Sequence, residues 1–176
     1  MKLRVAIIGC GAQGRNHLEC YRRMPDVEIA AICERNPVRL KASMKDFDIP
    51  HGFPDSGSLL DAGSYDLVAV CVMPVDHRDV TLAALANGAH VMCEKPFAMN
   101  ATEAAEMITA ARQAKRILTI GTNMRFLGNT SQIHQAIEKG LLGDHVYTRA
   151  WTNGIDIPWW GPHNTCLLYT SDAADE

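Results

Sequence analysis

The sequence of 176 residues lacks several features that would assign it to a particular class of protein. It has no run of basic residues and its net charge is -3, so we expect no nucleic-acid partner. Its longest apolar stretches, such as residues 67–74, are far too short to span a bilayer, and we expect no membrane partner. No separate hydrophobic region with a cleavage site precedes the first strand-like run, so we expect no signal peptide.

The six cysteines form no CxxC pair, and no Cys/His spacing matches a zinc site. The sequence therefore predicts no metal centre. Cys33, Cys71 and Cys93 lie near the ends of apolar runs, where a thiol packs as a small hydrophobic group. We expect reduced, structural cysteines, which are typical of the cytoplasm.

The sequence does contain a regular alternation of short apolar runs and helical patterns. Strand-like runs are expected in residues 3–8, 27–33, 51–53, 66–72, 89–93 and 116–121. Helical patterns are expected in residues 13–24, 37–45, 58–62, 77–87 and 100–115. The run at residues 66–72 lacks polar alternation, which fits a parallel strand covered on both faces. The alternation predicts βαβ units with right-handed crossovers, and therefore an α/β fold with a doubly wound parallel sheet of the Rossmann type.

The pattern changes after about residue 123. Residues 131–139 look helical, and residues 144–152 look like a longer strand with polar alternation, as at the start of an α+β domain with a mainly antiparallel sheet. We therefore expect a Rossmann domain in residues 1–122 and the incomplete start of a second domain in residues 123–165. Residues 166–176 resemble a translated sequencing adapter, which predicts a non-native tail. A native helical tail is the alternative.

Three glycines, Gly9, Gly11 and Gly14, form a G-x-G-x-x-G motif between the first expected strand and the first expected helix. In a dinucleotide-binding turn the first permits the turn, the second lets the backbone approach a diphosphate, and the third allows the helix to pack on the strand. The diphosphate then lies at the helix N-terminus, where free N–H groups and the helix dipole favour an anion. The motif alone is weak, but its context supports cofactor contacts by these glycines and by Ala12 and Gln13.

Glu34 follows Gly14 by 20 residues and ends the second expected strand. A carboxylate there can accept hydrogen bonds from both hydroxyls of an adenosine ribose, which favours NAD as the cofactor. The adjacent Arg35 leaves NADP open, because its guanidinium can meet a 2′-phosphate or stack on adenine. The alternative is that Glu34 is a solvated charge at the end of a strand.

Glu94, Lys95 and Pro96 follow the strand expected at residues 89–93. The carboxyl end of such a strand is the edge of an open α/β sheet where ligands bind. Pro96 biases Lys95 toward an extended conformation, which gives its ammonium a defined direction. A lysine there can hydrogen-bond a substrate oxygen and stabilise the charge that develops during hydride transfer. A surface charge is the alternative.

Several of these motifs together resemble the Gfo/Idh/MocA family of oxidoreductases. They are the glycine turn of residues 9–14, Met73-Pro74 followed by His77, and Glu94-Lys95-Pro96. Residues 121–126 and 139–143 also resemble the passage into this family's second domain, so the resemblance covers residues 1 to about 150. It implies a two-domain, NAD(P)-dependent dehydrogenase or reductase whose substrate is a sugar, polyol or cyclitol.

The resemblance also implies roles for single residues. Lys95 is expected to be the active-site lysine, and Glu94 a neighbour of the nicotinamide ribose. Pro74 and His77 are expected to line the cofactor cleft; a histidine in the first turn of a helix, without ligand contact, is the alternative for His77.

Two further residues are expected in the substrate region. Arg125 resembles the family's arginine near the active site, and Trp159 belongs to a segment that suits either a sugar-facing wall or the core of the second domain. The aspartate and histidine that usually assist proton transfer in this family have no match before Thr165. We therefore expect an N-terminal fragment without full activity, whose full-length form is a homo-oligomer.

Two other classes of function compete with an enzyme of this kind. A non-catalytic, dinucleotide-binding sensor or partner protein would share the fold, but it has no chemical need for Lys95. A methyltransferase-like domain also has a glycine turn and an acid after its second strand. The alternation of at least five strands, with Glu94-Lys95-Pro96 after residues 89–93, argues against it.

Overall fold

The computed structural model of the protein describes residues 2–144. They contain a sheet of six parallel strands in the order β3-β2-β1-β4-β5-β6. The strands are β1 (Leu3–Ile8), β2 (Val27–Cys33), β3 (Gly52–Phe53), β4 (Leu67–Val70), β5 (His90–Cys93) and β6 (Leu118–Ile120). The helices between them are α1 (Ala12–Arg22), α2 (Pro37–Phe47), α3 (Ser56–Asp61), α4 (His77–Ala86) and α5 (Ala101–Ala114), with a short 3-10 helix, η1 (Pro74–Asp76), before α4.

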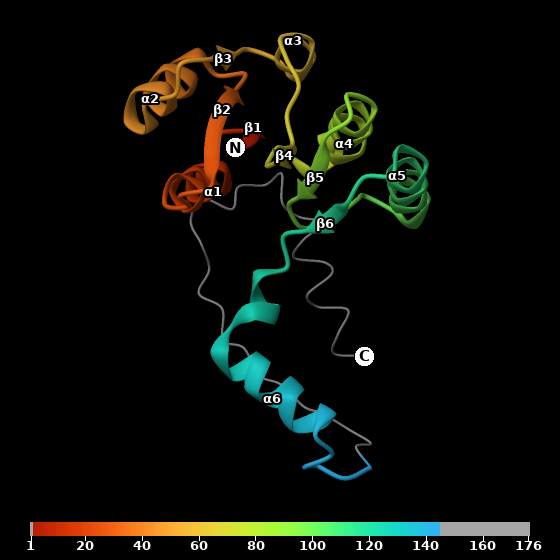
Figure 1. The fold of residues 1–176 in the computed structure, drawn as a ribbon. Helices are drawn as coiled ribbons and strands as arrows, with labels where there is room; N and C mark the ends of the chain where they lie inside the picture. The colour runs from red at the N-terminus through yellow and green to blue at the C-terminus, as the bar shows by residue number, and fades with distance from the viewer. Residues whose placement is uncertain (1, 145–176) are drawn as a thin grey trace. The chain divides into compact units, whose positions relative to one another are not determined.

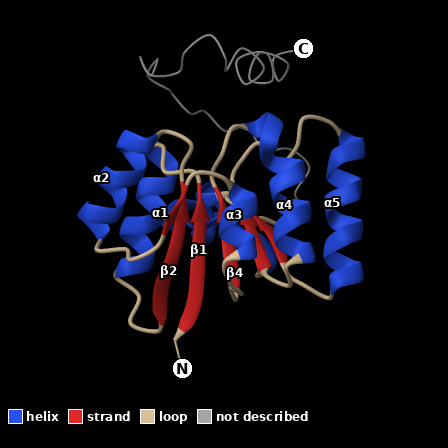
Figure 2. Cartoon of the chain, turned by 90° about the horizontal axis from the view of Figure 1, so that it is seen from above, coloured by secondary structure: helices blue, strands red, loops and turns tan. Residues whose placement is uncertain are grey.

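Helices cover both faces of this sheet (Figure 2). On one face α1 and α2 pack on β1 and β2, and Leu18 of α1 is fully buried there. On the other face α3, α4 and α5 contribute Leu59, Leu85 and Met107 to a second core cluster. Strands covered on both sides need apolar side chains on both sides, which explains the continuous apolar runs of the sequence. The predicted doubly wound parallel sheet is confirmed.

The strand order reverses at β1, which lies between β2 and β4. In Figure 1 the chain builds β2 and β3 on one side of β1, and then returns to build β4, β5 and β6 on the other. Because the strands are parallel, the turns that follow β1, β2 and β4 all leave the same edge of the sheet. Open α/β sheets bind their ligands at this edge, at the point where the order reverses.

Local capping interactions set where two of the helices begin. The side chain of Asn36 accepts hydrogen bonds from the N–H groups two and three residues later, and Pro37 is the first residue of α2. Asn100 caps α5 by accepting a hydrogen bond from the N–H of Glu103, and the Glu103 carboxylate accepts one in return from the backbone before the cap. These caps fix the chain just after the turns that follow β2 and β5.

The chain divides into two compact units between Thr122 and Asn123. The described part of the second unit contains η2 (Asn123–Phe126) and α6 (Gly128–Glu138), so the helix expected in residues 131–139 begins earlier, at Gly128. The strand expected in residues 144–152 lies, from residue 145 on, outside the described residues. The segment 166–176 also lies outside them. Within residues 2–144, no helix is long and apolar enough to cross a membrane.

The described cysteines, Cys10, Cys20, Cys33, Cys71 and Cys93, are all free thiols. Burial raises the pKa of Cys10 and of Cys93 to about 11, and that of Cys33 to about 12. These three thiols therefore stay protonated at neutral pH and lack the thiolate that metal binding or nucleophilic attack requires. Cys166 lies outside the described residues.

Candidate functional site

The turn after β1 is made of glycines that the fold needs for different reasons. Gly9 has a φ of +99°, and a Cβ there would lie 2.5 Å from the carbonyl oxygen of Cys71. A Cβ on Gly14 would lie 1.8 Å from the carbonyl oxygen of Gly9, so only glycine lets α1 pack this closely on the turn. At Gly11, by contrast, nothing lies within 4 Å of the Cβ position. Gly9 and Gly14 serve the turn itself, whereas Gly11 leaves open space above it.

The N-terminus of α1 borders this open space. Gly11 is its N-cap residue, no side chain caps the helix, and its first turn contains no acidic residue. Ala12 is exposed and Gln13 half-buried at the start of the helix. The first N–H groups of an uncapped helix are available to an anion and lie at the positive end of the helix dipole. The open space and the free helix end therefore fit the diphosphate of a dinucleotide.

Glu34 is buried directly after β2, and its carboxylate is held by three donors. One oxygen accepts a hydrogen bond from the backbone N–H of Cys10 at 3.1 Å, which ties the acid to the glycine turn. The other accepts from the backbone N–H of Asn36 at 2.8 Å and from the guanidinium of Arg39 at 3.0 Å. Burial raises the pKa of Glu34, but these hydrogen bonds outweigh burial and hold it below the ordinary glutamate value. The acid is therefore ionised at neutral pH.

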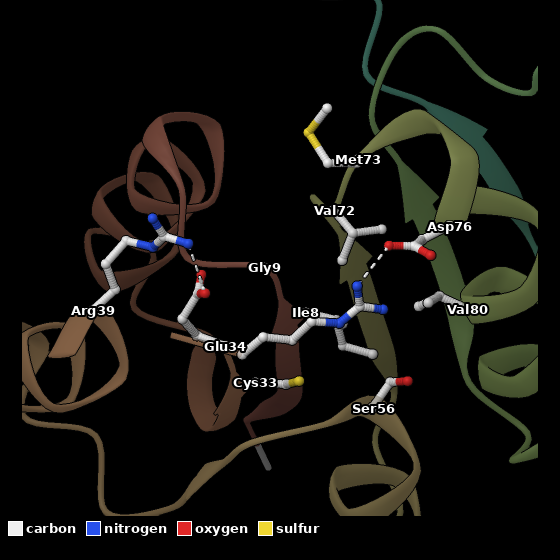
Figure 3. Close-up of a pocket in the computed structure, with 11 residues that line it drawn as sticks. Ile8, Gly9, Cys33, Glu34, Arg39, Ser56, Val72, Met73, Asp76 and Val80 are labelled. Atoms are coloured by element: carbon white, nitrogen blue, oxygen red, sulfur yellow. Dashed lines mark hydrogen bonds and ion pairs between the residues drawn. The ribbon is translucent and has the colours of Figure 1, made fainter. Parts of the chain in front are cut away.

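A pocket of about 170 Å³ lies at the carboxyl ends of β1, β2 and β4. Its walls include Gly9 and Glu34 on one side and Met73 and Asp76 on the other, as Figure 3 shows. The pocket is smaller than the roughly 300–1,000 Å³ of sites that enclose a drug-sized ligand. It therefore suits one end of a dinucleotide whose diphosphate lies on the glycine turn.

Two ion pairs connect residues of this pocket. Arg39, in the first turn of α2, pairs with Glu34 at 3.0 Å. Arg35 pairs with Asp76 of η1 at 3.1 Å. The dashed lines in Figure 3 mark both pairs. Arg35 lines the pocket together with Glu34, and its predicted contact with the adenosine of a cofactor stays a prediction.

The turn after β5 forms a second cluster. Glu94 is buried there, and one of its carboxylate oxygens lies 2.8 Å from Nε2 of His17 in α1. The other oxygen accepts a hydrogen bond from the backbone N–H of Lys95 at 3.1 Å. A Cβ on Gly121, after β6, would lie 2.8 Å from this carboxylate. Burial raises the pKa of Glu94. The hydrogen bonds from His17 and from the backbone of Lys95 lower it by more than burial raises it, so the pKa lies below the ordinary glutamate value.

Lys95 itself is exposed, at the same edge of the sheet as the glycine turn. Its peptide bond to Pro96 is cis. The backbone of Lys95 is anchored by Glu94, which is in turn bonded to α1. The turn that carries the lysine is thus attached to the helix whose N-terminus borders the glycine turn.

His77 is buried at the start of α4, with 1% of its surface exposed. Its Nδ1 lies 2.8 Å from the carbonyl oxygen of Pro96, and its Nε2 lies 3.1 Å from that of Val72. The imidazole therefore bridges the turn after β4 and the turn after β5. Neither His77 nor the half-buried Pro74 is among the described residues that line the pocket, so a direct contact of either with the cofactor stays a prediction.

The two residues expected near the substrate are not part of this arrangement. Arg125 is exposed in η2, which belongs to the second unit of the chain. Trp159 lies outside the described residues. No group of histidine, cysteine and acidic side chains that could hold a metal ion occurs within residues 2–144.

Three residues of the two clusters were not identified from the sequence: His17, Arg39 and Asp76. A signal existed for Arg39, because the cap at Asn36 places it in the first turn of α2, close to the end of β2. His17 had a weaker signal, because it lies three residues after Gly14 on the same helix. Asp76 had none, since its partner Arg35 comes from a distant part of the chain.

Comparison with known proteins places this geometry in context. The family model for Gfo/Idh/MocA proteins, described as an oxidoreductase family with an NAD-binding Rossmann fold, matches residues 3–122. The D-glucoside 3-dehydrogenase of Escherichia coli (strain K12) is 34% identical to this chain over 161 residues, which cover 90% of this chain and 46% of the relative. The myo-inositol 2-dehydrogenase of Thermotoga maritima is 29% identical over 80% of this chain and 42% of its own length.

A solved structure shows the same likeness in three dimensions. An oxidoreductase from Agrobacterium radiobacter, in complex with NAD⁺, L-tartaric acid and magnesium, superposes with a TM-score of 0.78 and 29% sequence identity. The match covers 82% of this chain and 42% of that one. The chain thus spans less than half the length of these relatives.

Proposed function

The chain belongs to the Gfo/Idh/MocA oxidoreductase family with its NAD-binding Rossmann fold, and on that premise we propose that it is the cofactor-binding part of an NAD(P)-dependent dehydrogenase. The proposed substrate is a CH–OH group of a sugar, polyol or cyclitol. The observation that carries the proposal is the combination, at one edge of the sheet, of the open glycine turn, the buried Glu34 and the exposed Lys95. The dehydrogenase relatives, named for a glucoside and for myo-inositol, support the substrate class.

In this proposal the chain's own residues bind and orient the cofactor. The N–H groups at the start of α1 hold the diphosphate above Gly11, where no side chain intervenes. Glu34 accepts a hydrogen bond from the adenosine ribose. A carboxylate has about four acceptor positions, and three are used within the protein, so Glu34 has room for about one ribose hydroxyl rather than two. Bound NAD supplies the nicotinamide ring that accepts or donates the hydride.

Lys95 is the residue proposed to contact the substrate. Its ammonium donates a hydrogen bond to the reacting oxygen. It stabilises the negative charge that this oxygen carries when a carbonyl carbon gains a hydride, or when an alcohol loses its hydroxyl proton before the hydride leaves. The hydrogen bonds that Glu94 accepts from the backbone N–H of Lys95 and from His17 support this role, because they fix the backbone that carries the lysine. Glu94, which is proposed to neighbour the nicotinamide ribose, lies at the same turn.

The remaining assignments concern the second part of the chain. We assign residues 1–122 to the cofactor domain and residues 123–165 to the incomplete start of a substrate and oligomerisation domain, with residues 166–176 as a non-native tail. Arg125 and Trp159 are proposed to face the substrate in the whole protein. Because the chain spans less than half of its relatives, we expect it to bind the cofactor without full catalytic activity.

Two measurements test this function. Fluorescence titration of the chain with NADH and NADPH should give saturable binding, and the absence of binding by both would overturn the proposal.

In the whole protein that contains this chain, Lys95→Ala should lower turnover of the best substrate among myo-inositol, glucose and related sugars by about a hundredfold or more. Lys41→Ala, which removes an exposed lysine of α2, is the matched control. Cofactor binding without turnover of any such substrate would favour a dinucleotide-binding sensor.

A further inference from the structure

The pocket at the reversal point of the sheet contains two arginines and two carboxylates, each arginine paired with one carboxylate. The pair of Arg39 and Glu34 stays on one wall, because both residues follow β2. Arg35 also follows β2, but its partner Asp76 comes from η1, after β4. Figure 3 shows Glu34 and Arg39 on one side of the pocket and Asp76 on the other, so the pair of Arg35 with Asp76 crosses it.

The two pairs differ in how firmly they are held. The Glu34 side chain is 7% exposed and accepts three hydrogen bonds, which fixes it against the glycine turn. The Arg35 side chain is 76% exposed and that of Asp76 is 30% exposed. Exposed ion pairs contribute little to stability and are easily exchanged for other partners. Arg35 is therefore the movable cation of the pocket, and Asp76 is the group that holds it in place.

This arrangement bears on the choice between the two dinucleotides, which differ by a 2′-phosphate on the adenosine ribose. A 2′-phosphate needs a nearby arginine, whereas free ribose hydroxyls need an acceptor such as Glu34. Arg39 is bonded to the firmly held Glu34, whereas Arg35 is bonded to the more exposed Asp76, so Arg35 is the guanidinium that a 2′-phosphate would recruit. Asp76 competes with the phosphate for that guanidinium and adds a second negative charge to the pocket.

We propose that Asp76 is a specificity-determining residue, which disfavours NADP(H) by holding Arg35 across the adenosine pocket. This inference rests on the proposed binding of a dinucleotide. It adds that Asp76, a residue after β4, influences which of the two dinucleotides binds. Glu34, the acid after β2, favours a ribose with free hydroxyls because its carboxylate accepts a hydrogen bond from them. Asp76 selects against the 2′-phosphate by occupying the cation that the phosphate requires. The exposed pair also predicts that the selection is moderate, because little free energy is needed to break it.

The test is the removal of the Asp76 charge with little change in shape. In the Asp76→Asn variant of the chain, we expect the Kd for NADPH to fall about tenfold, while the Kd for NADH changes by less than about twofold. Adenosine 2′,5′-bisphosphate and AMP, titrated by calorimetry, should show the same difference, because both probes contain the adenosine end without nicotinamide. Asp79→Asn is the matched control, since Asp79 is exposed, pairs with Arg78 and does not line the pocket.

A second variant separates the role of Arg35 from a general effect of charge. If the released arginine binds the 2′-phosphate, adding Arg35→Gln to Asp76→Asn should abolish the gain in NADPH affinity. Persistence of the gain in the double variant, an equal gain in Asp79→Asn, or an unchanged preference in Asp76→Asn would each overturn the inference. If the unaltered chain bound neither dinucleotide, the proposed function itself would fail. If the chain bound NADH but Asp76→Asn had the same preference for NADH over NADPH as the unaltered chain, only the role of Asp76 would be refuted.

Discussion

At the scale of single residues, the carboxylate of Glu94 is held from three sides at the carboxyl end of β5. His17 and the backbone N–H of Lys95 each bond one of its oxygens, and Gly121 leaves it the space that a Cβ would occupy. The resulting pKa lies below the ordinary glutamate value although the group is buried. A carboxylate with a lowered pKa in the folded state makes the stability of the domain depend on pH.

The first prediction follows from the sign of this shift. The unfolded chain binds the proton of Glu94 near the ordinary pKa of 4.5, whereas the folded chain binds it only at lower pH. The stability contributed by the ionised carboxylate is therefore present above pH 4.5 and is lost as the pH falls through the folded pKa. Glu94→Gln should be less stable than the unaltered chain at pH 7, and its stability should decline less below pH 4.5. Urea unfolding at pH 7 and between pH 5 and pH 3 measures both effects.

The control for this measurement is Glu28→Gln, which replaces an exposed glutamate of β2. It should leave the pH profile of the unfolding free energy almost unchanged. A profile for Glu94→Gln that runs parallel to that of the unaltered chain would show that the carboxylate is not held as the structure describes. Glu34 has a similarly lowered pKa, so part of the acid sensitivity should persist in Glu94→Gln.

The second prediction uses two glycines of the turn after β1, Gly11 and Gly14, to separate an effect on stability from an effect on cofactor binding. In Gly14→Ala the new methyl group meets the carbonyl oxygen of Gly9, so the free energy of unfolding should fall by about 1–3 kcal/mol. In Gly11→Ala the methyl group enters open space, and a φ of -68° suits alanine, so stability should change by less than about 1 kcal/mol. That space is where the diphosphate is proposed to lie, so the Kd of Gly11→Ala for NADH should rise about tenfold or more.

Denaturant unfolding and NADH titration of the two variants test this separation. A Gly11→Ala variant that binds NADH as tightly as the unaltered chain would place the diphosphate away from the glycine turn. A fully stable Gly14→Ala variant would contradict the close packing of α1 on Gly9.

At the scale of elements, the buried His77 joins the turn after β4 to the turn after β5. Its two ring nitrogens each face a backbone carbonyl oxygen, of Pro96 and of Val72. A neutral imidazole donates one hydrogen bond, so only one carbonyl has a donor unless the ring is protonated. His77 thus helps to position the residues around Lys95 without lining the pocket itself.

The third prediction concerns this bridge. His77→Leu replaces the imidazole by an apolar side chain of similar length and removes the donor, so the free energy of unfolding should fall by roughly 1–2 kcal/mol. Amide hydrogen exchange in residues 93–99 should rise, because that turn loses its contact with α4. The control is His134→Leu, whose side chain is 70% exposed in α6. Unchanged exchange in residues 93–99 would mean that the bridge does not hold the turn.

The elements also show how far sequence patterns reach. The predicted bounds of β1 and β2 are those of the structure, because a continuous apolar run ends where the buried strand ends. The expected strand at residues 66–72 is longer than β4, since its last apolar residues belong to the turn that leads into η1. The 3-10 helix was not expected, because Pro74 within a run of apolar residues gives no periodic signal.

Contacts between side chains were harder to predict than strands and helices. The glycine motif and Glu34 were identified because their spacing along the chain has a direct structural meaning. The pairing of His17 with Glu94 joins residues 77 positions apart, and no periodicity encodes which way two such side chains point. The same holds for Arg35 and Asp76, whose contact depends on the strand order of the sheet.

At the scale of the whole molecule, the proposed cofactor site lies entirely within the first unit of the chain. The glycine turn, Glu34 and Lys95 all precede Thr122, as do the six strands of the described sheet. The described part of the second unit exposes large apolar side chains, among them Phe126 at 85% and Leu141 at 72%. Exposed apolar groups of this kind promote association with other surfaces.

The last prediction is that a chain of residues 1–122 folds by itself and binds NADH with a Kd within about twofold of that of the 176-residue chain. Among the described residues, those of the sheet, of both core clusters and of the pocket all precede Asn123. Removal of the second unit should therefore leave the site intact. The shorter chain should also scatter less light on heating, because it lacks Phe126 and Leu141. Circular dichroism, NADH titration and light scattering test the three statements. A folded 1–122 chain that has lost NADH binding would show that residues of the second unit complete the site.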